Sequence, residues 1–380
     1  MANVKLSNVI RRAQTKVDKD DTDLVFYVGG EHIESENIRV HSRGIIAEST
    51  IGPMFYYGFK AGDFLLVSRN PHLKKAGLVD FDGICSEKTF VLETANSDVL
   101  LPEFLPFVLQ NERFWDYAYR HRHGSTNTFI NWSTLANYEF ELPDLETQRK
   151  LAEVLWSIND TMEAYKNLIS ATDELVKSQF MEQFGDPSNN VYGYPVTTLK
   201  EVAVGPLSYG SVSSATEFDG ITRYVRITDI MDDGNLGGDI KSATKTDAKY
   251  VLHEGDILFA RTGATVGKTC RYRENYGRAI YAGFLIRLIP DTTLIDPDYL
   301  YHFTKSDYYW DFVRSAQRVV AQPNINAQEY GDLQILLPKI EAQKSFAAFV
   351  QQSDKSKFEL EQALAELNAT YKRIIAENLG

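Results

Sequence analysis

The chain has 380 residues, of which 43% are hydrophobic and 24% charged, and its formal net charge is −12. This length predicts two or three domains, no apolar run approaches the roughly 18 residues of a membrane span, and two cysteines exclude a disulfide framework or a cysteine-rich metal site. The acidic balance argues against a protein that coats nucleic acid non-specifically, because phosphate binding needs lysine and arginine. The first residues lack the apolar core of a secretion signal, so we expect a cytoplasmic protein.

The first part of the chain predicts a globular unit of mixed α/β class. Short β-prone runs at 24–28, 64–68 and 89–92 are separated by Gly, Asn and Pro. One aromatic helix is expected around 103–119.

A long helix is expected next, from about 148 to 184, which corresponds to roughly 55 Å at 1.5 Å per residue. Pro143 and Asp144 supply its start, and the stretch 185–187 (Gly-Asp-Pro) supplies its end. Apolar residues recur in steps of four and three, as along the seam of a coiled coil. The alternative is the core helix of an ordinary bundle, but a seam this narrow favours pairing with a similar helix. The expected seam consists of Leu151, Leu155, Ile158, Met162, Tyr165 and Ile169.

The second part of the chain predicts the same elements in the same order. Its β-prone runs lie at 224–227, 256–260 and 284–289, and its aromatic helix around 298–313. A second long helix follows, with a seam that is apolar at both ends and polar in the middle. The apolar positions of this seam are Phe346, Val350, Leu360, Leu364 and Leu367.

These parallels extend to the residues themselves. The segment Leu142–Gln148 (Leu-Pro-Asp-Leu-Glu-Thr-Gln) returns 195 positions later as Leu337–Gln343 (Leu-Pro-Lys-Ile-Glu-Ala-Gln). Several blocks in one order exclude coincidence, so the chain is a tandem duplication. The other matching blocks are Phe114–Tyr117 with Tyr309–Phe312, Ile130–Asn131 with Ile325–Asn326, Gly62–Leu65 with Gly255–Leu258, and Tyr27–Val28 with Tyr224–Val225.

The expected fold is therefore mixed α/β, with two globular α+β domains and two long helices that form an antiparallel coiled coil. Such a pseudo-two-fold repeat would hold two similar domains apart on a rigid spacer. Duplex DNA with two separated half-sites suits that arrangement. The predicted domains are 1–142 and 189–337 for the globular units, and 143–188 and 338–380 for the helical spacers.

The repeated start of each long helix, Leu-Pro-x-Leu/Ile-Glu-x-Gln, resembles the specificity (S) subunit of Type I restriction-modification systems. The segments Tyr224–Ile230 (Tyr-Val-Arg-Ile-Thr-Asp-Ile) and Gly255–Lys268 (Gly-Asp-Ile-Leu-Phe-Ala-Arg-Thr-Gly-Ala-Thr-Val-Gly-Lys) resemble that family as well. The resemblance covers essentially the whole chain. In the first half the run Ser68–Lys75 departs from it, because the Thr-Gly-Ala-Thr-x-Gly-Lys sequence is absent there.

The resemblance implies a non-catalytic subunit whose two target recognition domains bind an asymmetric, bipartite sequence of double-stranded DNA. It also implies that the spacers set the gap between the half-sites and dock two modification (methyltransferase) subunits, with restriction (translocase and endonuclease) subunits joining them. S-adenosylmethionine, ATP and Mg are then expected in the partner subunits and no cofactor in this chain.

Alternative functions rest on weaker signals. The run Gly263–Thr269 resembles a phosphate-binding loop, but it has one residue too few between its glycines, and strands rather than a helix are expected after it. A stand-alone enzyme using this loop is therefore disfavoured. The seven histidines are not clustered, so no metal site is expected. A two-domain protein-interaction adaptor without a DNA role remains the main alternative.

Charge placement supplies the candidate contact residues. Segment 143–188 carries 4 basic and 9 acidic side chains, whereas basic residues cluster in both globular units, and in 257–290 six of them accompany the single acid Glu274. Solvated strand faces are the alternative for each cluster. Arginine, asparagine and glutamine can read base edges, and lysine holds phosphate. The candidate DNA contacts are Arg69, Asn70, His72, Lys74, Arg120, Arg122 and Asn127 in the first unit, and Arg261, Thr262, Lys268, Arg271, Arg273 and Gln322 in the second.

Overall fold

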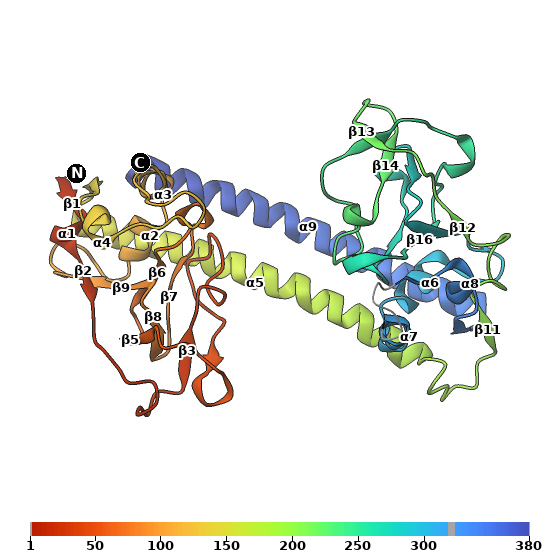
Figure 1. Ribbon diagram of the computed structural model, residues 1–380, viewed down its shortest axis with the longest axis horizontal. Coiled ribbons are helices and arrows are strands. Elements are labelled where there is room, and N and C mark those ends of the chain that lie inside the picture. Colours follow the sequence, from red (N-terminus) through yellow and green to blue (C-terminus); the bar gives the residue numbers. More distant parts are fainter. Residues whose placement is uncertain (1, 318–323, 380) are drawn as a thin grey trace. The chain divides into compact units, whose positions relative to one another are not determined.

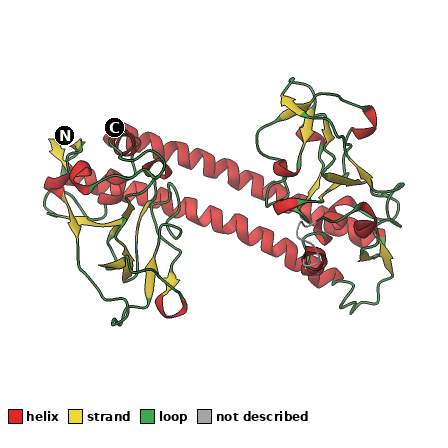
Figure 2. Ribbon diagram, viewed as in Figure 1, coloured by secondary structure: helices red, strands yellow, loops and turns green. Residues whose placement is uncertain are grey.

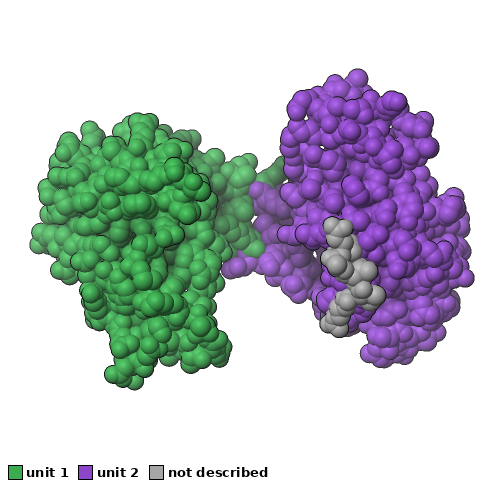
Figure 3. Space-filling view, in the orientation of Figure 1, with its two compact units in different colours: residues 1–166, 362–380 green, residues 167–361 purple. Residues whose placement is uncertain are grey.

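The computed structural model describes residues 2–317 and 324–379. The chain divides into two compact units, which Figure 3 shows in different colours. Unit 1 contains residues 1–166 and 362–380, and unit 2 contains residues 167–361. Both units combine strands with helices (Figure 2), so the mixed α/β class is confirmed for each.

Unit 1 is organised around two four-stranded sheets and one two-stranded sheet. The first sheet is antiparallel with the order β2-β9-β6-β7, the second has the order β4-β3-β8-β5 and contains the parallel pair β3 and β8, and β1 pairs with β10. The strands are β1 (Ala2–Lys5), β2 (Ile10–Ala13), β3 (Phe26–Val28), β4 (Gly44–Ile45), β5 (Phe55–Phe59), β6 (Phe64–Val67), β7 (Ala76–Leu78), β8 (Gly83–Ser86), β9 (Thr89–Thr94) and β10 (Glu139–Leu142).

Unit 2 repeats this topology. Its antiparallel sheet has the order β12-β19-β16-β17, β14 and β18 form the parallel pair, and β11 pairs with β20. Each of these pairings has its counterpart in unit 1, so the internal repeat is confirmed. The strands are β11 (Val196–Thr198), β12 (Ser208–Tyr209), β13 (Ala215–Glu217), β14 (Arg223–Val225), β15 (Lys241–Ala243), β16 (Ile257–Ala260), β17 (Thr269–Arg271), β18 (Ala279–Tyr281), β19 (Leu285–Leu288) and β20 (Gln334–Leu336).

The central strands β6 and β16 read as continuous apolar runs because both of their faces are buried. In β6, Phe64 and Leu66 belong to the core that includes the helices, whereas Leu65 and Val67 belong to a second core under the mixed sheet. In β16 the same alternation divides its four residues between two cores. Each unit is therefore layered, with its antiparallel sheet between helices and further strands.

The helices differ from expectation at one point in each unit. One aromatic helix was expected around 103–119 and one around 298–313, but each is broken into two. In unit 1 the break is fixed by Asn111, whose side chain accepts a hydrogen bond from Phe114 N at 2.9 Å and so caps the second helix. The helices are α1 (Leu6–Val9), α2 (Leu105–Leu109), α3 (Glu112–Arg120), α4 (Trp132–Leu135), α5 (Leu145–Phe184), α6 (Pro297–Phe303), α7 (Asp307–Gln317), α8 (Ala327–Gly331) and α9 (Ile340–Leu379).

The two long helices α5 and α9 each have 40 residues and contribute to both units (Figure 1). In unit 2, Phe180 of α5 lies 5.5 Å from Phe346 of α9 between ring centroids. Further along the same pair of helices, Asp173 pairs with Lys357 at 2.5 Å. Along this pair of helices the residue numbers decrease on α5 while they increase on α9, so the two helices run in opposite directions. The expected antiparallel pairing is therefore confirmed there.

The expected seam residues lie inward on these helices. Leu155, Phe346 and Val350 are buried. The remaining seam residues are half-buried, namely Leu151, Ile158, Met162, Tyr165, Ile169, Leu360, Leu364 and Leu367. No helix within 2–317 or 324–379 combines the length and apolar character that crossing a bilayer requires.

A buried glutamine ties the start of each long helix to its unit. Gln343 accepts a hydrogen bond from Asp296 N at 2.8 Å and donates to Leu294 O at 3.1 Å and Pro338 O at 2.8 Å. Gln148 makes the same three bonds in unit 1, and both side chains are fully buried. The repeated Leu-Pro-x-Leu/Ile-Glu-x-Gln sequence therefore has a packing function.

Candidate nucleic-acid interface

The loop after β6 in unit 1 is held by a segment distant in the sequence. Ile130 N donates to Ser68 O at 2.9 Å, and Asn70 N donates to Thr128 O at 2.8 Å. This pairing brings residues 68–75 beside 121–130. Two clusters of candidate contacts that are far apart in the sequence therefore lie together.

The loop after β16 in unit 2 is built in the same way. Ile325 N donates to Arg261 O at 2.9 Å, and Thr262 forms an isolated bridge with Asn324. By this pairing Arg261 occupies the position of Ser68, and Asn324 that of Phe129. The two loops are equivalent in backbone but carry different side chains.

Both loops contain two left-handed residues four positions apart. In unit 2 they are Gly263 (φ 70°) and Gly267 (φ 86°), whereas in unit 1 they are Asn70 (φ 49°) and Lys74 (φ 48°). The glycine-rich sequence is absent from the first half, yet the backbone conformation is shared. Asparagine adopts this region more readily than most residues, while lysine does so at a cost of about 1 kcal/mol.

The opposing helix explains why unit 1 accepts lysine at this position. A Cβ at Gly267 would lie 2.6 Å from Cγ1 of Val313 on α7, whereas a Cβ at Gly263 would meet nothing within 4 Å. The counterpart of Val313 in the 195-residue repeat is Ala118 on α3. The smaller alanine leaves the space that the Cβ of Lys74 requires.

We expect Gly267→Ala to lower the free energy of unfolding by about 2–4 kcal/mol, since a left-handed alanine is strained and its Cβ overlaps Val313. Gly263→Ala is the matched control and should lose only about 1–2 kcal/mol, because it carries the strain without the overlap. Urea denaturation of both variants measures the difference. Equal losses would show that the contact with Val313 does not matter.

The unit 1 loop presents basic and aromatic side chains together. Arg69, His72, Arg120 and Asn127 are exposed. The Arg122 guanidinium stacks on the ring of Tyr119 at 3.7 Å. Its Nη1 donates to Tyr119 O at 2.7 Å, and the remaining donors of a stacked arginine suit contact with bases or phosphates.

Two aromatic residues of this surface were not among the sequence candidates. Tyr119 is 44% exposed and Phe129 is 39% exposed. Both belong to apolar patterns that, in sequence, are typical of a core. Only the pairing of 121–130 with the loop shows that these rings face outward.

Lys74, by contrast, is engaged within unit 1. Its Nζ lies 2.7 Å from a carboxylate oxygen of Glu112 and 3.0 Å from one of Glu36, and Glu36 also pairs with Lys372 of α9. These contacts make Lys74 less available for phosphate than its sequence environment suggested.

The basic cluster of unit 2 is largely neutralised by acids from elsewhere in that unit. Arg271 is only 12% exposed and lies between Asp298 and Glu254, at 3.1 and 3.2 Å. The local excess of positive charge in the sequence is therefore not an excess at the surface. The other pairs are Lys268 with Asp232 at 2.7 Å, Arg273 with Asp354 at 2.8 Å, and Arg287 with Asp256 at 3.6 Å.

Arg261 differs from these residues. It forms no ion pair within 4 Å with any residue of 2–317 or 324–379. Thr262 next to it is half-buried. Gln322, the remaining candidate of unit 2, lies outside the described residues.

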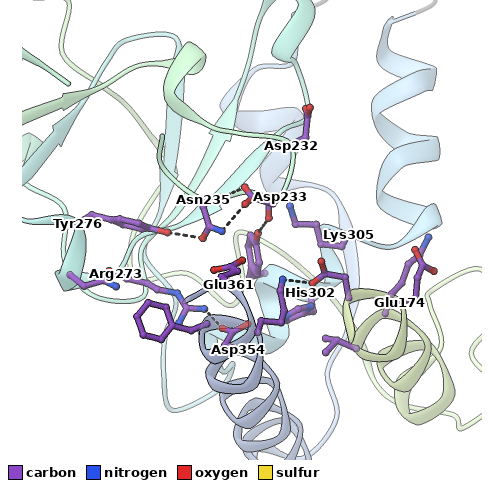
Figure 4. A pocket seen from close by; sticks show the side chains of 17 residues that line it. Glu174, Asp232, Asp233, Asn235, Arg273, Tyr276, His302, Lys305, Asp354 and Glu361 are labelled. Atoms are coloured by element: carbon purple, nitrogen blue, oxygen red, sulfur yellow. Dashed lines mark hydrogen bonds and ion pairs between the residues drawn. The ribbon is translucent and has the colours of Figure 1, made fainter. Parts of the chain in front are cut away.

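Unit 2 also contains a cavity of about 520 Å³ (Figure 4), and Asp232 in its lining pairs with Lys268 at 2.7 Å. Six carboxylates and four cationic side chains line it, among them Asp173, Asp354 and Lys305. Arg273 and Lys357 are paired with acids, and Lys305 has no ion-pair partner within 4 Å among the described residues. A net acidic lining repels phosphate, so we do not place DNA in this cavity.

Burial lowers the pKa of Lys305 to about 8. In the unfolded chain its pKa is about 10.5, so the folded state carries a penalty that is fully present below pH 8 and disappears as the pH rises to 10.5. We expect Lys305→Met to raise the free energy of unfolding by at most about 3 kcal/mol at pH 7. Urea titrations at pH 7 and pH 10 should show a clearly smaller gain at pH 10. A gain independent of pH would contradict this account.

The possible reactive groups of the described residues include two free, buried cysteine thiols. Burial raises the pKa of the Cys85 and Cys270 thiols to about 12, so neither is a thiolate nucleophile. Within 2–317 and 324–379 no group of three or more His, Cys, Asp or Glu side chains could hold a metal ion.

The sequence of the chain matches the model of a known protein family. The model of the Type I restriction modification DNA specificity domain matches residues 11–171 and again residues 195–369. The chain belongs to this family. The two matches also follow the internal repeat, with one specificity domain in each half.

A curated member of the family is only distantly related to this chain. The Type I restriction enzyme HindI specificity subunit of Haemophilus influenzae is 26% identical over 132 residues. This match spans 33% of the chain and 28% of that relative's length, so it covers less than a third of the curated relative.

Solved structures show the same fold over the full length. The S subunit of a Type I restriction-modification system from M. genitalium has a TM-score of 0.62 at 14% identity, covering 100% of this chain and 96% of that chain. A chain from a structure on complex assembly and conformational transition of the type I R-M system has a TM-score of 0.57 at 20% identity, covering 99% and 97%.

Proposed function

We propose that this chain is the DNA sequence-specificity subunit of a Type I restriction-modification complex. In this role it recognises an asymmetric bipartite target in double-stranded DNA and assembles two modification (methyltransferase) subunits and the restriction subunits in the cytoplasm. It performs no chemistry itself, and S-adenosylmethionine, ATP and Mg act in the partner subunits.

The proposal rests on one loop conformation that occurs in both units, with different side chains in each. Both loops share their left-handed residues and their pairing to a distant segment. At equivalent positions unit 1 has Ser68 and Phe129, whereas unit 2 has Arg261 and Asn324. A shared backbone conformation with different side chains suits the reading of two different half-sites.

Electrostatics favour recognition within a complex. Most cations of the unit 2 cluster are paired with acids, and the first helical spacer carries 9 acidic and only 4 basic side chains. Non-specific affinity for phosphate must then come largely from the partner subunits, since it scales with the number of phosphates that cations neutralise.

The test is to express the full chain with its modification subunits and to map methylated adenines across the genome. We expect one motif with two different half-sites and a fixed gap. Fluorescence anisotropy with duplexes that contain or lack the motif then measures discrimination at physiological salt. Equal binding to all duplexes by a saturating, intact complex would contradict the proposal and favour the protein-interaction adaptor.

A further inference from the structure

Arg261 is held in a fixed orientation at the surface of unit 2. Its Nε donates to Oδ1 of Asn324 at 3.1 Å, and its guanidinium lies 4.7 Å from the centroid of the Tyr209 ring. Tyr209 is fixed in turn, because its hydroxyl accepts a hydrogen bond from Ala327 N at 3.0 Å. The backbone of Arg261 bonds on both sides, its N to Phe284 O at 3.1 Å and its O to Ile325 N at 2.9 Å.

This arrangement uses one donor and leaves the others free. With Nε bound to Asn324, the Nη1 and Nη2 groups remain as a two-pronged donor with no acidic partner within 4 Å among the described residues. Stacking on Tyr209 fixes the plane of the fork, so less rotamer entropy is lost when it binds. Tyr209 is 42% exposed, and Phe284, whose carbonyl accepts the bond from Arg261 N, is 60% exposed.

The geometry points to a guanine as the ligand of Arg261. We infer that Arg261 reads the O6 and N7 atoms of a guanine in the half-site bound by unit 2, and that Asn324 and Tyr209 are its positioning residues. The inference rests on the proposed function. A guanine presents two acceptors side by side in the major groove, which match a planar pair of N–H donors.

Unit 1 has no equivalent of the arginine held by Asn324 and Tyr209 among its described residues. Its residue equivalent to Arg261 is Ser68, which is buried and donates to Lys88 O at 2.7 Å, and its residue equivalent to Asn324 is the apolar Phe129. The inference therefore assigns the guanine read by this arrangement to the half-site that unit 2 binds.

The experiment uses the full chain in complex with its modification subunits. Methylation mapping first defines the target. Each guanine of that target is then replaced in turn by 7-deazaguanine, which lacks N7, and binding of the duplex is measured by anisotropy. For the unsubstituted chain we expect a guanine in the half-site bound by unit 2 at which the replacement weakens binding about tenfold, as the loss of one hydrogen bond to a charged donor predicts.

Arg261→Ala should abolish the sensitivity to 7-deazaguanine at that position and leave the other half-site unchanged. Asn324→Ala and Tyr209→Leu should reduce the sensitivity at the same guanine without removing it. A merely structural role would instead weaken all duplexes equally. Arg278→Ala is the matched control, because Arg278 is exposed and also lacks an ion pair among the described residues.

The outcomes separate the two proposals. If the complex recognises a target but Arg261→Ala keeps the same sensitivity at every guanine, or weakens all duplexes equally as a phosphate contact would, the inference is overturned and the proposed function stands. It is also overturned if no guanine of the target is sensitive in the unsubstituted chain. If the intact complex recognises no target, the proposed function itself fails.

Discussion

Gln343→Leu is expected to lower the free energy of unfolding of unit 2 by about 3–6 kcal/mol. The substitution removes the side-chain partner of three backbone groups, namely the part-buried Asp296 amide and Leu294 carbonyl and the buried Pro338 carbonyl. Each such group costs about 1–3 kcal/mol. Because Asp296 also caps α6 through bonds to Asp298 N and Tyr299 N, the loss should spread into that helix.

Hydrogen exchange of the full chain locates this effect, and urea denaturation gives its size. Faster exchange is expected around residues 294–300 and the start of α9, with unit 1 unaffected. Gln148→Leu should produce the corresponding loss of stability in unit 1, with unit 2 unaffected, because Gln148 makes the equivalent bonds there. Gln351→Leu, an exposed position on α9, is the control. A loss below about 1 kcal/mol for Gln343→Leu would show that these bonds contribute little.

Arg271→Leu is expected to destabilise unit 2 by about 3–5 kcal/mol, because it leaves the buried Asp298 carboxylate without its cation. Burial already raises the pKa of Asp298 despite the nearby guanidinium. Without Arg271 the folded state should favour the protonated acid still more. The loss should therefore be largest at neutral pH and should shrink as the pH falls through the raised pKa of Asp298, where the carboxylate takes up a proton.

Urea titrations at pH 7 and pH 4.5 check this expectation. The double variant Arg271→Leu with Asp298→Asn should recover part of the lost stability, since no buried charge remains. Arg278→Leu, at an exposed position, should change stability by less than about 0.5 kcal/mol. A variant Arg271→Leu of normal stability but with a changed DNA target would instead support the direct DNA contact that its sequence environment suggested.

Local patterns predicted most of the architecture. The seam of α5 and the repeated Leu-Pro-x-Leu/Ile-Glu-x-Gln motif predicted two long helices and a duplicated fold, because helix periodicity and cap residues act over a few positions. The break between α2 and α3 was missed, because the aromatic pattern of 103–119 suggested one helix although Asn111, a common N-cap residue, lies within it. The structure shows that the Asn111 cap interrupts it.

The candidate interface was harder to predict. Arg261, Arg271 and Arg273 look alike in sequence, each on a β-rich segment with few acids nearby. In the fold, Arg271 faces Asp298 and Glu254, and Arg273 faces Asp354, all distant in the sequence. Arg261 meets Asn324 and Tyr209 instead. Asn324 and Tyr209 carried no signal of their own, because nothing local links them to Arg261.

The sequence by itself determined the duplication, the mixed α/β class, the long helices and the family, all of which depend on periodicity or on contiguous motifs. The net charge of −12 also follows from the sequence, but the sequence does not show which of the charges are paired with one another. Which cations remain free is decided by the tertiary structure, because an ion pair depends on distance in space and acts over only a few ångströms. The fold paired most cations of the 257–290 cluster with acids from elsewhere in unit 2, and it left Arg261 oriented and without an ion pair among the described residues.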